Sequence, residues 1–169
     1  MSENNKIQNN KVKPGRSALA NERVRTSDDD HHMEFVDAVN GIAYINDSGS
    51  VRLSATRNSI EAIETSVVLV TGGDDHGNDY SLLRKVIKEK VVGVIYLGNS
   101  SDLFLKHFSS QEMFFAKAEN INEAVMIADA FSRSGDVVLF SPACSGCSGS
   151  DNYKVRGNRF KAAVKNLRG

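Results

Sequence analysis

The sequence predicts an α/β fold: a mostly parallel sheet with helices on both faces, opened by a β-hairpin. Two observations indicate the sheet. Short apolar runs alternate with segments of helical spacing from residue 53 to residue 167, and the runs are continuously apolar, as in strands buried on both faces. A third observation, the pair Asn40-Gly41 between two short apolar stretches, indicates the hairpin.

The hairpin is expected over residues 34–45. Glu34–Val39 and Ile42–Ile45 flank Asn40-Gly41. A two-residue hairpin turn needs positive φ at both central positions, and Asn and Gly adopt it at little cost. A two-stranded ribbon therefore begins the folded part.

Helices and strands alternate after the hairpin. Buried strands are predicted at Val67–Val70, Val91–Leu97 and Asp136–Phe140, with a weaker strand at Met113–Ala116. Helical spacing predicts helices over about 53–64, from Leu82 to Ile87, from Leu103 to Phe108, behind Asn120, and over about 152–167. Asp79 precedes the second helix as an N-cap, and Asn120 with Glu123 forms a capping-box pattern before the fourth.

Residues 1–32 are predicted to be a flexible polar tail and residues 33–169 one folded domain, which suits a chain of 169 residues. The apolar residues of the tail, Ile7, Val12, Leu19 and Val24, are sparse and irregularly spaced. Such a composition cannot offset the entropy of ordering. We therefore expect its deletion to leave the thermal midpoint nearly unchanged.

Composition excludes several classes of protein. The 21 Lys and Arg balance 21 Asp and Glu, which removes any global electrostatic argument for a nucleic-acid or membrane partner. No apolar run approaches the roughly 18 residues of a membrane span, and the first residues carry no signal core, so a cytoplasmic location is expected. Two cysteines cannot form a disulfide framework.

Ligands of parallel α/β sheets bind outside the carboxyl ends of the strands, which draws attention to two loops. The first, Thr71–Asp79, contains three glycines with Asp74, Asp75 and His76. Glycines let backbone approach a ligand, although the same residues are common in ordinary turns. Consecutive residues rarely converge on one metal ion, so we predict no metal here.

The second loop, Ser141–Ser150, holds Cys144 and Cys147 at Cys-x-x-Cys spacing. A redox role is one interpretation, but thioredoxin-like motifs follow the first strand of their unit and this pair follows the last. A zinc site needs four ligands, and the four histidines, His31, His32, His76 and His107, show no recognisable pairing with these thiols. A small-residue loop that admits a ligand to the next helix is favoured, and a redox role for the cysteines stays open.

Two further features bear on ligands. Nothing in the chain matches Gly-x-x-x-x-Gly-Lys-Ser/Thr or Gly-x-Gly-x-x-Gly, the two common phosphate-binding loops. The last sixteen residues carry Lys154, Arg156, Arg159, Lys161, Lys165 and Arg168 and no acidic residue. They form either an anion-binding face or, as we favour, a solvated face that complements the helix dipole.

Four stretches are distinctive in order and spacing. They are Glu34–Val36 continuing through Asn40–Ser48, Val68–Asp74, Gly135–Cys144, and Asn152-Tyr153 with Arg156–Phe160. Together they resemble the C-terminal domain of the Mur ligases, most closely the D-glutamate-adding branch, over about residues 31–168. The resemblance implies a Rossmann-like fold, a place in peptidoglycan precursor synthesis, and ATP and magnesium as cofactors of the full family enzyme.

The resemblance also implies site residues. Positions that match the family's ligand-binding pattern are Asn46, Asp47, Ser48, Gly72, Gly73, Asp74 and Tyr153. Six positions depart from it: the family has lysine at Gly49 and His76, threonine at Val51, arginine at His32, serine at Gly146 and aspartate at Ser148. Losing both lysines removes charge-assisted contacts to a dicarboxylic amino acid, so D-glutamate should bind weakly or not at all.

The expected function is therefore that of a stand-alone, degenerate Mur-ligase C-terminal domain, which positions an amino acid and is not catalytic alone. No cofactor, metal or catalytic residue is assigned to this chain by itself. Two alternatives stay open: a subunit or fragment of a split D-glutamate ligase with a separate ATP-binding chain, and a regulatory module that binds a small anion or a partner protein.

Overall fold

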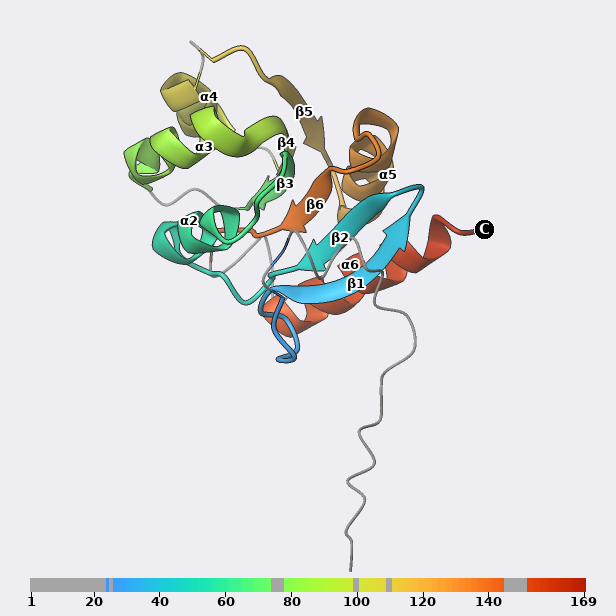
Figure 1. Ribbon diagram of the computed structural model, residues 1–169. Helices are drawn as coiled ribbons and strands as arrows, with labels where there is room; N and C mark the ends of the chain where they lie inside the picture. The colour runs from blue at the N-terminus through green and yellow to red at the C-terminus, as the bar shows by residue number, and fades with distance from the viewer. Residues whose placement is uncertain (1–23, 25, 74–77, 99–100, 109–110, 145–151) are drawn as a thin grey trace, which may run out of the picture.

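The computed structural model describes residues 24, 26–73, 78–98, 101–108, 111–144 and 152–169. A six-stranded sheet crosses the domain in the order β1-β2-β6-β3-β4-β5 (Figure 1). The strands are β1 Glu34–Val39, β2 Ile42–Asn46, β3 Val67–Gly72, β4 Val91–Leu97, β5 Phe114–Ala118 and β6 Val137–Phe140. β1 pairs antiparallel with β2, and the other pairings are parallel.

Helices cover both faces of the sheet. They are α2 Leu53–Glu61, the 3-10 helix η1 Tyr80–Leu83, α3 Arg84–Lys90, α4 Asp102–Phe108, α5 Ile121–Phe131 and α6 Tyr153–Asn166. One apolar core joins the sheet to α2, η1, α3 and α4, and a second joins it to α5 and α6 (Figure 1). The predicted fold class is confirmed. No described helix is long and apolar enough to cross a membrane.

The continuously apolar strands serve both cores. Val137 and Leu139 of β6 pack into the first core, and Val138 and Phe140 pack into the second. Successive strand residues point to opposite faces, so a strand covered on both sides needs apolar residues at every position. This requirement explains why such runs were readable from the sequence.

Local signals also predicted turns and caps correctly. Asn40 and Gly41 adopt φ of 51° and 79° in the β1–β2 turn. Asp79 caps η1 by accepting a hydrogen bond from the Ser81 N–H, and Asn120 caps α5 by accepting from the Glu123 N–H at 3.0 Å. The Glu123 carboxylate accepts from the Glu119 N–H, one residue earlier than in a standard capping box.

The predicted boundary between tail and domain lies too far along the chain. Val24 is 5% exposed within the first core and forms an isolated bridge with Ile63. Ser27 bridges to Glu34, and His31 is 6% exposed. Single contacts of this kind leave no periodic pattern in the sequence, which is why composition alone assigned these residues to the tail. Residues 1–23 lie outside the described part.

Candidate functional site

The carboxyl ends of the parallel strands form one edge of the sheet. β2, β6, β3 and β4 run side by side in the same direction, so the segments that follow Asn46, Phe140, Gly72 and Leu97 leave from this edge. Open α/β sheets bind their ligands here. The two loops chosen from the sequence both begin at this edge, as expected.

Asn46, Asp47 and Ser48 turn away from the end of β2 and are buried, with exposed fractions of 0%, 2% and 0%. Asp47 connects two other segments of the chain. Its Oδ1 accepts a hydrogen bond from the Met33 N–H at 3.1 Å, and its Oδ2 accepts from the Ser141 hydroxyl at 2.8 Å. The carboxylate therefore joins the segment before β1 to the loop after β6.

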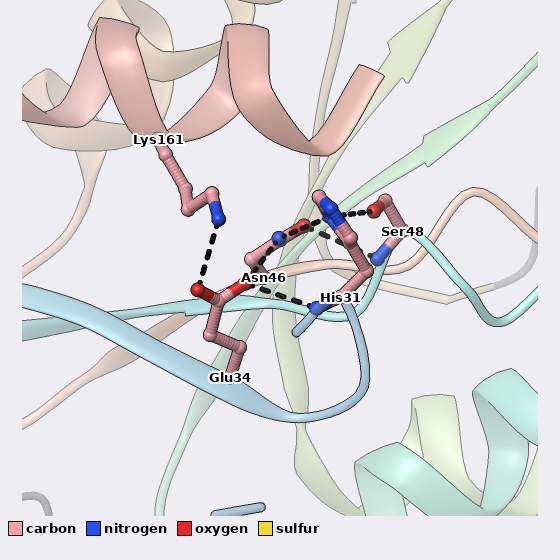
Figure 2. Close-up of polar contacts among 5 residues, drawn as sticks. All are labelled: His31, Glu34, Asn46, Ser48 and Lys161. Carbon is pink, nitrogen blue, oxygen red and sulfur yellow. Dashed lines mark hydrogen bonds and ion pairs between the residues drawn. The ribbon is translucent and has the colours of Figure 1, made fainter. Parts of the chain in front are cut away.

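His31 lies inside a polar cluster with Asn46, Ser48, Glu34 and Lys161 (Figure 2). The Asn46 Nδ2 donates to Glu34 Oε2 at 2.8 Å and lies 3.0 Å from His31 Nδ1. An amide nitrogen can only donate, so Nδ1 is the acceptor and the neutral ring carries its proton on Nε2. The Ser48 hydroxyl lies 3.2 Å from the same Nδ1.

Glu34 links the cluster to α6. Its Oε1 accepts from Lys161 Nζ at 3.0 Å, and its Oε2 also accepts from the His31 N–H at 3.0 Å (Figure 2). Burial alone would raise the pKa of this carboxyl, but the bonds from the His31 N–H, Lys161 and Asn46 hold the pKa of Glu34 below its ordinary value of 4.5.

The pKa of His31 is lowered from its ordinary value of 6.5, first by burial and next by the positive charge of Lys161, against the opposing effect of Glu34. A proton on Nδ1 would also remove its acceptor role toward Asn46. The neutral ring is therefore the form that the folded domain favours.

We expect the free energy of unfolding to decrease as pH falls below 6.5, because the unfolded chain then binds a proton that folded His31 binds less readily. The contribution is fully present above pH 6.5 and is lost as pH falls through the lowered pKa of the folded state. Urea denaturation at pH 7.5 and at pH 5, each about one unit or more from 6.5, measures this effect. Between these two pH values, the free energy of unfolding of His31→Gln should change less than that of the wild type. His32→Gln, at the exposed neighbouring position, is the control. An equal change in the free energy of unfolding for the two variants would contradict the expectation.

His32 lies beside Tyr153 and beside Gly49, which is in the loop after β2. The Tyr153 ring centroid is 5.8 Å from that of His31 and 6.2 Å from that of His32. A Cβ added to Gly49 would lie 2.3 Å from His32 Cε1, although Gly49 has no positive φ. The His32 ring therefore occupies the space that any side chain at position 49 needs.

Gly157 allows α6 to approach the cluster closely. A Cβ there would lie 2.2 Å from His31 Nδ1 and 2.4 Å from the Ser48 hydroxyl oxygen. A buried histidine, a serine and a helix thus meet at one point, and only glycine leaves room for them.

Gly72 and the loop after β6 are joined by direct contacts. Gly72 has φ of 112°, and a Cβ there would lie 2.6 Å from the Leu97 carbonyl oxygen, so glycine is required. The Cys144 thiol donates to the Gly72 carbonyl at 3.2 Å, and Arg156 Nη2 donates to the Cys144 carbonyl at 3.0 Å. Cys144 is buried, and through these contacts it links Gly72 to Arg156.

The structure brings only part of the predicted site together. The His32 ring lies beside both Gly49 and Tyr153. The three matched residues after the body of β2 are buried: Asn46, Asp47 and Ser48. The Val51 N–H donates to the Gly49 carbonyl. Asp74, His76, Gly146 and Ser148 lie outside the described residues, as does Cys147. Within the described ranges there is no group of three His, Cys, Asp or Glu residues able to hold a metal ion.

No sequence pattern identified His31 or Arg156 as an important residue. His31 stood in the predicted tail, and Arg156 was assigned to a solvated face, yet the exposed fraction of Arg156 is 2%. Lys154, Arg159, Lys165 and Arg168 are exposed, as predicted for that face. One available signal was Gly157, since a glycine inside a helix often marks a close approach.

No protein-family model matches the chain. It is 38% identical over 138 residues to UDP-N-acetylmuramoylalanine–D-glutamate ligase of Chloroherpeton thalassium, covering 82% of this chain and 29% of that ligase. The ligase of the same name from Porphyromonas gingivalis is 36% identical over 154 residues, covering 88% of this chain and 34% of the relative. This chain is a homologue of the Mur ligases. It spans about a third of the length of these Mur ligases and matches their C-terminal-domain region.

A solved murein peptide ligase has the same fold. The murein peptide ligase of Psychrobacter arcticus superposes with a TM-score of 0.56 at 9% identity, covering 80% of this chain and 30% of that one. At this level of identity the likeness concerns the fold alone. It agrees with the Rossmann-like architecture that the Mur-ligase resemblance implies.

Proposed function

We propose that this chain acts as a Mur-ligase C-terminal domain whose amino-acid site has lost the charges for D-glutamate and which forms no amide bond by itself. The observation that carries the proposal is the arrangement at Gly49. The family's lysine is absent there, and the His32 ring fills the space beside the glycine.

The matched residues beside Gly49 support the same proposal. Asn46 and Ser48 contact His31, and Asp47 accepts hydrogen bonds from Met33 and Ser141. These side chains therefore hold residues 31–34 and the loop after β6 in place. A ligand that used them would have to displace buried contacts within the domain.

The residues present do not fit ATP and magnesium. The sequence contains no Gly-x-x-x-x-Gly-Lys-Ser/Thr loop, and the described residues contain no carboxylate cluster of the size a metal requires. In a complete ligase these groups would come from elsewhere, either another part of the same polypeptide or a separate ATP-binding chain. Such a domain or chain is the partner that the proposal implies.

Restoring the family's charges should restore affinity for D-glutamate. The variant His32→Arg with Gly49→Lys and His76→Lys removes the ring that lies against position 49 and returns three cationic side chains. Each charge-assisted contact is worth roughly 1.5–3 kcal/mol, so we expect affinity at least about tenfold higher than that of the wild type. Calorimetric titration with D-glutamate measures it, with thermal denaturation to verify folding.

The matched control is His32→Arg with Ser54→Lys and Asn58→Lys, which adds the same charges but places both lysines at exposed positions of α2. It should bind no better than the wild type. If the restored variant is folded and binds D-glutamate as weakly as the wild type, the loss of charge does not explain the site. If the wild type already binds D-glutamate tightly, and the restored variant binds no more tightly, the proposal is wrong.

A further inference from the structure

A cavity of about 550 Å³ lies at the carboxyl edge of the sheet, among the ends of β3, β4 and β5, the first turn of α5 and one side of α6. Its volume is within the range of small-molecule sites, about 300–1,000 Å³. His31, His32, Asn46, Ser48 and Tyr153 do not line it. It is therefore distinct from the cluster described above, on the face that α5 and α6 cover (Figure 1).

One stripe of α6 supplies the positive charge. Arg156, Arg159, Ala162 and Asn166 line the cavity, and their spacing of three, three and four residues places them along one side of the helix. Phe160, Ala163 and Val164, on another side of α6, pack into the second core. The helix is therefore anchored through one side while two arginines, about one turn apart, line the cavity.

Arg156 is held in a defined orientation. It is 2% exposed, and its Nη2 donates to the Cys144 carbonyl at 3.0 Å while its Nη1 lies 3.5 Å from the Cys144 sulfur. Arg159 is exposed. One arginine of the lining is thus buried and held in place by Cys144, and the other is exposed to solvent.

The part of the lining outside α6 carries groups of different chemistry. Glu119 follows β5, and Asn122 lies in the first turn of α5. Gly73 and Gly98 also line the cavity, and a Cβ at Gly98 would have only the Gly73 carbonyl within 4.0 Å. The backbone at Gly98 therefore has open space beside it, and the exposed Glu119 adds a carboxylate to a lining that also contains two arginines.

This arrangement selects among anions. Guanidinium groups bind phosphate through paired N–H donors, and a carboxylate accepts hydrogen bonds from hydroxyl groups. Glu119 would repel the second charge of a dicarboxylate. We propose that the cavity binds a phosphorylated sugar group, with the phosphate on Arg156 and Arg159 and sugar hydroxyls donating to Glu119.

Titration of the isotope-labelled full chain with ribose 5-phosphate, followed by NMR, tests the site. We expect saturable shifts of the amides of Gly98, Asn122 and Arg159 and none centred on Asn46 and Ser48. Inorganic phosphate should bind at least tenfold more weakly, and ribose should not bind measurably. AMP distinguishes the source of the sugar phosphate: tenfold tighter binding than ribose 5-phosphate identifies a nucleotide, and equal binding identifies a simple sugar phosphate.

Variants assign the contacts. Arg159→Gln, at an exposed position, should weaken ribose 5-phosphate binding at least tenfold, whereas Lys165→Gln, an exposed charge on the same helix that does not line the cavity, should change it less than twofold. Glu119→Gln should reduce the advantage of ribose 5-phosphate over inorganic phosphate. The proposal is overturned by an absence of saturable shifts in the folded wild type, by ribose binding as well as ribose 5-phosphate, or by equal effects of Arg159→Gln and Lys165→Gln.

Discussion

Deletion of residues 1–32 is expected to lower the thermal midpoint by about 10–20 °C, at roughly 2–4 °C per kcal/mol for a domain of this size. The deletion removes Val24 from the first core and His31 from its contacts with Asn46 and Ser48. Burial of a valine contributes roughly 1.5–3 kcal/mol, and each lost hydrogen bond leaves a buried partner unsatisfied at about 1–3 kcal/mol.

Deletion of residues 1–23 is the matched control. It retains every contact that the structure describes, so the midpoint should change by less than about 4 °C, the equivalent of roughly 1 kcal/mol. Differential scanning calorimetry of both truncated chains against the full chain makes the comparison. Equal midpoints for the two truncations would restore the boundary at residue 32 that composition predicted.

Asp47→Ala is expected to destabilise the domain by about 2–6 kcal/mol, because one partly buried and one buried donor lose their acceptor at roughly 1–3 kcal/mol each. These donors are the Met33 N–H and the Ser141 hydroxyl. Ser141 also lies 2.8 Å from the Thr56 hydroxyl, so the loss reaches α2. The segment before β1 and the loop after β6 should both loosen.

Urea denaturation compares Asp47→Ala with Glu112→Ala, which removes an exposed carboxylate and should change stability by no more than about 0.5 kcal/mol. Asp47→Asn keeps one acceptor and should fall between them. A loss of less than about 1 kcal/mol in Asp47→Ala would contradict the buried linking role. It would instead agree with a side chain that is free to meet a ligand.

Both predictions concern residues whose roles the sequence could not supply. Val24 lies in the first core and bridges to Ile63, and contacts between residues so far apart in the sequence leave no period to detect. The Asn46–Ser48 stretch matched a ligand-binding pattern, but a pattern of residue types carries no information on whether the side chains face solvent or the interior. The same holds for Arg156, which resembled a solvated charge.

The sequence by itself determined the features that depend on neighbours along the chain. The turn at Asn40-Gly41 follows from the φ values these residues tolerate, the caps at Asp79 and Asn120 from short-range hydrogen bonds, and the two-sided burial of β6 from its unbroken apolar run. Family resemblance likewise rested on linear order and spacing. These properties can be predicted from the sequence because their causes act within a few residues.

Only the tertiary structure decided what the candidate site can contact. His31 reaches Ser48 across 17 positions, Lys161 reaches Glu34 across 127, and the ring of His32 lies against Gly49. The cavity between α5 and α6 likewise assembles from the ends of β3, β4 and β5 with a stripe of the last helix. Side-chain direction, burial and the space left between elements depend on how distant segments pack, and no local preference encodes them.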